Sequence, residues 1–263
     1  MRDSLRLRAL DAKDRMSGRS DRLVPPRRLD FVGHSDFADT GDEFLTHFVE
    51  LGGLQPSHRV LDIGCGIGRM ARPLAGYLSA EGSYDGFDVN REGVGWCRRR
   101  YARFKNFHFQ VADLYNRRYN PRGAQKAIDY RFPYEDERFD FAILTSVLTH
   151  LLEDEAEHYL AETGRVLKPG GRALATFFLL ESESRALIAS GRSGLDFLEP
   201  EAHVSVLSDD VPEEAVAYDE GWVYERAGTH GLSVREPICP GTWCGRDEGL
   251  TFQDVVVFEK AAR

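Results

Sequence analysis

The stretch Val60-Leu61-Asp62-Ile63-Gly64-Cys65-Gly66-Ile67-Gly68-Arg69 decides the fold of this chain. An apolar, β-favouring run ends in three glycines at every second position, and Arg69-Met70-Ala71 can begin a helix. Strand, glycine-rich loop and helix in this order form the unit by which α/β sheets hold an adenosine-containing cofactor. The glycines allow a sharp turn against which a ligand can lie, and the helix N-terminus offers free N–H groups to a carboxylate or phosphate.

The spacing of the glycines distinguishes between cofactors. A dinucleotide-binding loop, G-x-G-x-x-G, would place its third glycine at position 69, where this chain has Arg69. The pattern G-x-G-x-G after Val-Leu-Asp-Ile resembles motif I of the class I S-adenosylmethionine (SAM)-dependent methyltransferases. The resemblance implies SAM as cofactor and S-adenosylhomocysteine as product. It also implies that cofactor contacts come from Asp62, Gly64, Cys65, Gly66 and Gly68.

Two later strands end in an acid. Ser83–Val89 reads as a short strand in which Asp88 lies 20 residues after Gly68, and a carboxylate there can accept hydrogen bonds from both ribose hydroxyls. An ordinary turn or helix cap is the alternative for Asp88. In the resembled family an acid after the third strand holds the adenine amine and the next residue flanks the ring. This implies cofactor roles for Asp113 and Leu114, and we include Val89 and Thr145 in the expected site.

Two further elements complete the resemblance over residues 58–180. Residues 138–146 read as a buried strand, and residues 166–172 contain a helix end followed by the Leu-Lys-Pro-Gly-Gly turn. Strands alternate with helices expected to begin at Thr40 and to lie near 69–79, 91–104, 153–167 and 219–229. Alternation of this kind predicts an α/β, doubly wound sheet. The resemblance implies seven strands in the order 3-2-1-4-5-7-6 with strand 7 antiparallel, the last two strands being 232–238 and 251–259.

The chain is expected to consist of a basic, flexible extension at residues 1–28 and a methyltransferase domain at residues 29–263. Two segments exceed what the sheet needs, residues 115–131 and 182–218. Long irregular insertions in compact domains are usually binding loops. We therefore expect both segments to form walls of the acceptor site. The protein is expected to be a monomer or a homodimer.

Composition and charge exclude several classes. The net charge is −9, and residues 1–28 are basic, so the remainder carries about −14, which disfavours binding to a nucleic-acid backbone. No apolar run is long enough to cross a bilayer and no signal peptide is visible, so we expect a cytoplasmic protein. The four cysteines lack zinc-ligand spacing and are expected to be reduced thiols, a Cys239–Cys244 disulfide being the alternative; no metal is expected.

Methyl transfer from a sulfonium is an in-line displacement in which positioning supplies much of the acceleration. A hydroxyl acceptor needs a base, whereas a carboxylate does not. His150 follows the fourth strand by about one helical turn, and a histidine pKa of about 6.5 suits proton abstraction, so His150 is the candidate base. Its alternative roles are to cap the next helix or to pack in a polar pocket. Candidate acceptor contacts are His34, Tyr218, Trp243 and Arg246, although the tryptophan could instead bury its loop against the sheet.

These features favour a SAM-dependent methyltransferase that O-methylates a small polar acceptor such as a sugar, a glycan unit or a secondary metabolite. A small-molecule N-methyltransferase and a non-catalytic SAM-binding regulatory protein are the alternatives. A nicotinamide dehydrogenase is disfavoured by Arg69 at the third glycine position and by the terminal pair of strands.

Overall fold

The computed structural model describes residues 21–29, 36–198 and 203–262. Within it the chain forms two compact units, one that contains the residues up to His58 and Cys65–Ala112, and one that contains Arg59–Gly64 and the residues from Asp113 onward. Residues 1–20 of the expected extension and the candidate acceptor residue His34 lie outside the described residues, while Arg27–Leu29 forms the 3-10 helix η1.

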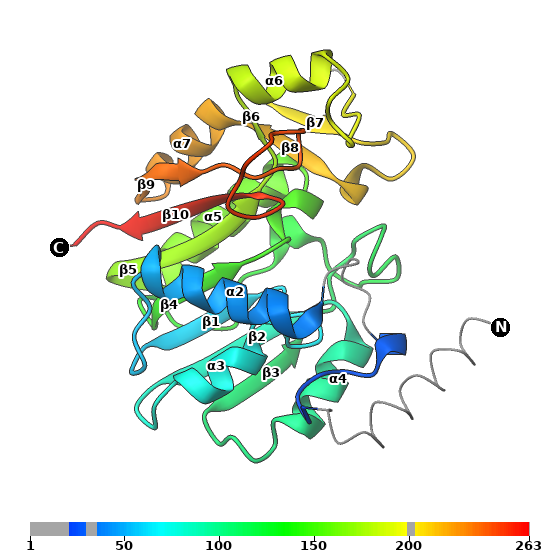
Figure 1. The fold of residues 1–263 in the computed structure, drawn as a ribbon. Helices are drawn as coiled ribbons and strands as arrows, with labels where there is room; N and C mark the ends of the chain where they lie inside the picture. The colour runs from blue at the N-terminus through cyan, green and yellow to red at the C-terminus, as the bar shows by residue number, and fades with distance from the viewer. Residues whose placement is uncertain (1–20, 30–35, 199–202, 263) are drawn as a thin grey trace. The chain divides into compact units, whose positions relative to one another are not determined.

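In the first unit, helices α2 (Phe37–Glu50), α3 (Ala71–Tyr77) and α4 (Arg91–Arg100) accompany strands β2 (Ser83–Asp88) and β3 (Phe107–Val111) (Figure 1). The two strands are parallel. The sequence placed the start of α2 at Thr40, which is wrong, because the carboxylate of Asp36 accepts hydrogen bonds from the backbone N–H groups of Ala38 and Asp39 and starts the helix one turn earlier.

An aromatic cluster forms the core of the first unit. Tyr84 of β2 stacks on Phe107 of β3 with ring centroids 5.0 Å apart. Tyr101, which ends α4, lies 5.8 Å from Phe107 and 5.0 Å from Phe109. All four side chains are buried. Offset aromatic pairs add to the hydrophobic stabilisation of burial, so this cluster fixes α4 against β2 and β3.

The second unit contains the remaining strands of the large sheet. They are β1 (Arg59–Ile63), β4 (Phe139–Leu144), β5 (Leu167–Phe177), β9 (Leu232–Cys239) and β10 (Asp254–Lys260). β4 pairs in parallel with β1 and β5, and β10 runs antiparallel to β5 and β9. The sheet order is β3-β2-β1-β4-β5-β10-β9. Counting only the strands of this sheet, the order is 3-2-1-4-5-7-6 with strand 7 antiparallel, which confirms the expected topology.

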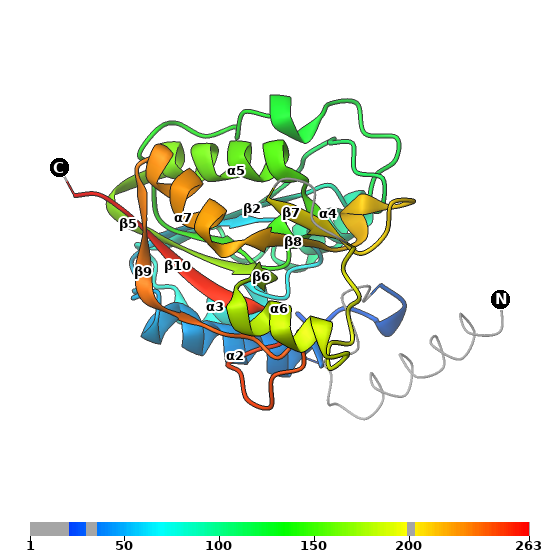
Figure 2. The same cartoon turned by 90° about the horizontal axis from the view of Figure 1, so that it is seen from above.

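Helices α5 (Glu153–Val166) and α7 (Glu220–Thr229) lie side by side within the second unit (Figure 2). Arg226 and His230 both reach Glu157 of α5, at 3.4 Å and 3.2 Å. The short 3-10 helix η3 (Leu148–His150) connects β4 to the start of α5. Both long helices begin close to the boundaries expected from the sequence, since acidic residues in their first turns favour a helix N-terminus.

The second insertion is not the irregular loop that the sequence suggested. It contains α6 (Ser182–Ala189), β7 (Val204–Val206), η4 (Pro212–Glu214) and most of β8 (Val216–Asp219). β8 pairs with β7 and with β6 (Leu179–Leu180) in a separate three-stranded sheet (Figure 1). The prediction of irregular structure failed because this sheet has a small core of its own. That core consists of Phe178, Leu180, Ala215, Ala217, Trp243 and Cys244.

The first insertion stays largely irregular. It contains the 3-10 helix η2 (Ala127–Asp129) and two isolated bridges, Leu114 to Gln125 and Asn116 to Asn120. None of the helices in the described part of the chain has the length and apolar character needed to cross a membrane.

Candidate active site

The glycine-rich loop of the first unit is held tightly against α4. Gly68 has a φ of +82°, and a Cβ added there would lie 3.0 Å from Sγ of Cys97. A Cβ on Gly93 of α4 would lie 2.8 Å from the carbonyl oxygen of Gly66. The backbone N–H of the buried Cys65 donates to the carbonyl of Phe87 at 3.0 Å. The loop therefore needs glycine both for its backbone conformation and for its packing.

Asp88 lies at the end of β2, next to this loop. One carboxylate oxygen accepts a hydrogen bond from the backbone N–H of Gly66 and the other from that of Asn90, each at 2.7 Å. Burial raises the pKa of Asp88, and the two N–H groups oppose that shift. Each carboxylate oxygen keeps a further lone pair. The half-buried Asp88 and Val89 therefore fit the expected ribose-binding position.

Other expected cofactor residues belong to the second unit. Asp62 is buried in β1, and Gly64 follows with a φ of +77°. Asp113 accepts a hydrogen bond from the side-chain amide of Asn120 at 3.2 Å, and Asn120 also donates to the carbonyl of the buried Leu114 at 2.9 Å. The first insertion thus folds back onto the two residues that the resemblance assigns to adenine.

A polar cluster surrounds the carboxyl ends of β4 and β5. Thr145 is half-buried, and Ser146 after it has a φ of +54°, which is uncommon for a residue other than glycine. The Ser146 N–H donates to Oγ1 of Thr176 at 2.8 Å. The hydroxyls of Ser146 and Thr176 both donate to Oε1 of Gln253, at 3.0 Å and 2.5 Å. Gln253 lies 107 residues from Ser146 and carries no motif, so the sequence did not indicate its place in this cluster.

His150 ends η3 with both ring nitrogens close to a partner. Nδ1 lies 2.9 Å from the carbonyl oxygen of Glu213, and Nε2 lies 3.3 Å from the hydroxyl of Tyr119. Because a carbonyl can only accept, Nδ1 carries the proton and Nε2 presents its lone pair. Burial of the imidazole ring lowers the pKa of His150 below its usual value, and the nearby positive charge of Arg118 lowers it further. The ring is therefore neutral at pH 7.

The Tyr119 contact was not predicted, although Tyr119 lies in an insertion already suspected of forming an acceptor wall. Asn116 shapes that insertion: its Oδ1 accepts from the N–H groups of Arg118 and Tyr119, at 3.1 Å and 2.9 Å. Its Nδ2 donates to the carbonyl of His150 at 3.2 Å. The only available signal was the abundance of Tyr, Asn and Arg in residues 115–131, which does not single out one residue.

Tyr218 and Trp243 do not lie where an acceptor contact requires, because both are buried. The Tyr218 hydroxyl donates to the carbonyls of Leu148 and Leu151 and so holds η3 in place. Trp243 packs on Phe178 in the core of the small sheet, which is the alternative that the sequence had left open.

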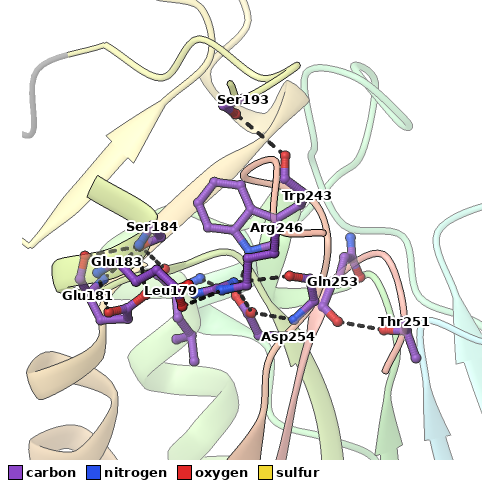
Figure 3. A network of polar contacts seen from close by, with 11 residues as sticks. Leu179, Glu181, Glu183, Ser184, Ser193, Trp243, Arg246, Thr251, Gln253 and Asp254 are labelled. Atoms are coloured by element: carbon purple, nitrogen blue, oxygen red, sulfur yellow. Dashed lines mark hydrogen bonds and ion pairs between the residues drawn. The ribbon is translucent and has the colours of Figure 1, made fainter. Parts of the chain in front are cut away.

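The side chain of Arg246 is also held by contacts within the protein (Figure 3). Its guanidinium, 8% exposed, pairs with Glu181 at 2.6 Å, Glu183 at 3.0 Å and Asp254 at 3.3 Å. Asp254 also accepts from the indole N–H of Trp243 at 2.6 Å. The expected stacking of this Trp–Arg pair on an acceptor is therefore replaced by a network that joins α6 to the segment before β10.

The next features are the possible metal ligands and the cysteines among the described residues. No group of three or more metal-ligating side chains occurs among them. Cys65, Cys97, Cys239 and Cys244 are free thiols, so the disulfide alternative is not realised.

Comparison with known proteins finds a methyltransferase domain in this chain. A family profile described as a methyltransferase domain matches residues 60–171. A fatty-acid O-methyltransferase of Mycolicibacterium smegmatis is 33% identical over 118 residues, which are 45% of this chain and 36% of that protein. Such matches span only 36% to 43% of the length of the first four curated relatives.

Solved structures share the fold at low identity. The magnesium protoporphyrin IX methyltransferase of Synechocystis PCC 6803, solved with S-adenosylhomocysteine, is 17% identical, with a TM-score of 0.55 over 96% of this chain and 99% of that one. The [4+2]-cyclase SpnF is also 17% identical, with a TM-score of 0.57 over 89% of this chain and 86% of that one. Taken with the sheet order, these findings show a methyltransferase domain at residues 60–171 and a fold shared with the SAM-dependent class I methyltransferases, whose cofactor is SAM.

Proposed function

We propose that this chain is a SAM-dependent methyltransferase that O-methylates a hydroxyl group of a small-molecule acceptor, with His150 as general base. The observation that carries this proposal is the contact of His150 Nδ1 with the carbonyl oxygen of Glu213 at 2.9 Å, from which the tautomer follows. The bond from Nδ1–H to the carbonyl of Glu213 leaves the lone pair of Nε2 available for a proton. A lowered pKa keeps Nε2 unprotonated at neutral pH.

The proposal assigns the binding of SAM to the residues that the resemblance names. Asp88 accepts hydrogen bonds from the ribose hydroxyls with the lone pairs that Gly66 and Asn90 leave free. Asp113 and Leu114 recognise adenine, and the loop glycines allow close approach of the backbone. Bound SAM supplies a methyl group activated by its sulfonium. We also keep Asp62, Gly64, Cys65, Gly68, Val89 and Thr145 in this set.

In the proposed reaction, the residues of this chain move one proton, that of the acceptor's hydroxyl group. The acceptor oxygen forms a bond to the methyl carbon as the bond from that carbon to sulfur breaks, and its proton moves toward His150 Nε2. The imidazolium keeps its Nδ1–H bond to Glu213 and releases the new proton to solvent. The products are a methyl ether and S-adenosylhomocysteine.

The choice of a hydroxyl acceptor depends on the base. A fatty-acid carboxylate, suggested by the name of the Mycolicibacterium relative, is already ionised and needs no base. A neutral amine needs none to attack, which keeps N-methylation as the alternative. A regulatory protein without activity would not need a neutral, oriented histidine at this position.

The test measures transfer of radiolabelled methyl from SAM to four probes: methyl glucoside, 4-methylumbelliferone, phenethylamine and palmitic acid. We expect transfer to a hydroxyl probe and a loss of about 10²- to 10⁴-fold in turnover for His150→Ala, without loss of SAM binding. His158→Ala is the matched control, since His158 also bonds a backbone carbonyl, that of Tyr130. Transfer only to palmitic acid or phenethylamine, unaffected by His150→Ala, would contradict the proposal.

We further propose that residues 29–263 act as one domain, in the cytoplasm, as a monomer or homodimer. Light scattering of the chain with and without residues 1–28, together with its SAM affinity, tests the domain boundary and the oligomeric state. A truncated chain that no longer binds SAM would argue against this boundary.

A further inference from the structure

The hydroxyl of Tyr119 lies beside the lone pair of His150 that would take the acceptor's proton. Its hydroxyl lies 3.3 Å from Nε2 of His150, and its ring meets the imidazole edge-on with centroids 5.2 Å apart. Nε2 has a single lone pair, so an acceptor hydroxyl cannot bond to it while Tyr119 does. We propose that Tyr119 is a catalytic residue that carries the acceptor's proton to His150. This inference rests on the proposed role of His150.

The alternative, in which the acceptor displaces Tyr119, is opposed by the contacts that hold Tyr119 in place. The backbone N–H of Tyr119 is bonded to Asn116, which is itself bonded to the carbonyl of His150. The guanidinium of Arg118 lies 5.6 Å from the centre of the Tyr119 ring and is fixed at 2.7 Å to Glu214. Rotating the Tyr119 side chain away would break its contacts with Arg118 and His150, whereas a relay leaves both intact.

Contacts from both insertions also hold His150 in this arrangement. The N–H of Arg117 donates to the carboxylate of the buried Glu213 at 3.2 Å, and the carbonyl of Glu213 accepts from His150. The first insertion and η4 of the second insertion therefore both contact η3. Tyr119 is nevertheless 41% exposed and its contact with His150 is also exposed, so an acceptor can reach the hydroxyl from solvent.

The relay consists of two proton transfers. The acceptor's hydroxyl proton moves to the phenol oxygen of Tyr119 while the Tyr119 proton moves to Nε2 of His150. Tyr119 is therefore unchanged in net charge, and His150 becomes an imidazolium that retains its bond to Glu213. The acceptor oxygen forms its bond to the methyl carbon in the same step as the carbon–sulfur bond breaks. The positive charge of Arg118 beside the ring favours negative charge on the phenol oxygen during transfer.

The experiment is a double-mutant cycle of Tyr119→Phe and His150→Ala. It measures turnover with methyl glucoside or 4-methylumbelliferone, whichever the wild type methylates faster. Residues that act as one proton path are not additive. We expect each single variant to lose turnover by a similar factor, of order 10²-fold, and the double variant to lose no more than either. KM and SAM affinity should change little.

Tyr224→Phe is the matched control. Tyr224 is similarly exposed, at 37%, and its hydroxyl donates to Glu236, far along the chain from the candidate site. It should keep wild-type turnover. An equal loss in Tyr224→Phe would show that removing any such hydroxyl is harmful and would overturn the assignment.

The other outcomes are equally distinct. Wild-type or faster turnover in Tyr119→Phe with a loss in His150→Ala would overturn the relay but leave the proposed base in place. Multiplicative losses in the double variant would also overturn it, because the two residues would then act separately. Full turnover in His150→Ala would refute the proposed base itself, and the relay with it.

A measurement without acceptor complements the cycle. Titration of the His150 ring by NMR with labelled histidine should show the Nδ1–H tautomer, and Tyr119→Phe should shift the Nε2 resonance by removing its hydrogen-bond donor. An unshifted Nε2 resonance would show that the two groups are not bonded in solution and would overturn the relay.

Discussion

Asp88 accepts a hydrogen bond from the backbone N–H of Gly66 at 2.7 Å, which ties the end of β2 to the glycine-rich loop. The same carboxylate holds Asn90, the residue that caps α4. One side chain therefore connects the loop, the strand and the next helix, and it does so with lone pairs left over for a ligand. The arrangement explains why an acid, rather than a neutral residue, stands at this strand end.

We predict that Asp88→Ala weakens SAM binding by about 1.5–3 kcal/mol, the value of a hydrogen bond to a charged group. Calorimetry with SAM measures this. Glu81→Ala serves as control, because the exposed carboxylate of Glu81 accepts a hydrogen bond from the nearby Ser79 hydroxyl and lies outside the motif. Equal SAM affinities for Asp88→Ala and wild type would remove Asp88 from the ribose role.

The backbone at Gly64 gives a second prediction. Gly64 and Gly170 have nearly the same φ, +77° and +76°, but a Cβ at Gly64 would lie 2.4 Å from Cγ2 of Val147, whereas nothing lies within 4 Å at Gly170. Alanine at 170 should cost about 1–2 kcal/mol of stability from the left-handed conformation alone. Alanine at 64 should cost about 1–3 kcal/mol more through overpacking. Urea denaturation of both variants measures the difference, and equal costs would show that Val147 moves aside freely.

Much of the fold could be predicted because its signals are local. Alternating and apolar runs mark β2, β3 and β4, and the Leu-Lys-Pro-Gly-Gly turn marks the start of β5. The small sheet could not be predicted, because β6 and β7 are short and their pairing with β8 joins segments separated in sequence. The start of α2 was misplaced because two plausible caps, Asp36 and Thr40, lie four residues apart.

The candidate site was predicted less completely, and for a related reason. His150 could be proposed from its distance after a strand, but its partners Tyr119 and Glu213 lie 31 and 63 residues away, in insertions without periodicity. Arg246 looked available for a ligand because the sequence does not show that Glu181 and Asp254 neutralise it. Burial and long-range pairing, rather than residue type, decide such roles.

Tyr218 allows a direct test of whether burial, rather than residue type, decides the role of a side chain. Its buried hydroxyl donates to the carbonyls of Leu148 and Leu151, so Tyr218→Phe should cost about 1–3 kcal/mol of stability by leaving a buried acceptor without its donor. The KM for the acceptor should not change. Thermal unfolding and steady-state kinetics measure both quantities. A raised KM with unchanged stability would instead support the acceptor contact that the sequence suggested.

The last prediction concerns His150 and pH. Burial lowers the pKa of His150 below 6.5. Between that lowered pKa and 6.5, the unfolded chain binds a proton that the folded chain does not bind. The free energy of unfolding contributed by His150 is therefore complete above the unfolded pKa and is lost as the pH falls through this window.

His150→Gln isolates this contribution, since its side-chain amide can still donate to the carbonyl of Glu213 but does not titrate. Urea denaturation at about pH 8 and about pH 5 should show that the stability of the wild type relative to this variant decreases as the pH falls. The neighbouring residues Arg118, Glu213 and Glu214 are present in both proteins. Any pH-dependent contribution that they make equally to the stability of both therefore cancels in the comparison. For the same reason, turnover of the wild type should inflect below pH 6.5. A stability difference that is independent of pH would show that His150 titrates alike in the folded and unfolded chains, and an inflection above 6.5 would indicate a partner that stabilises its charged form.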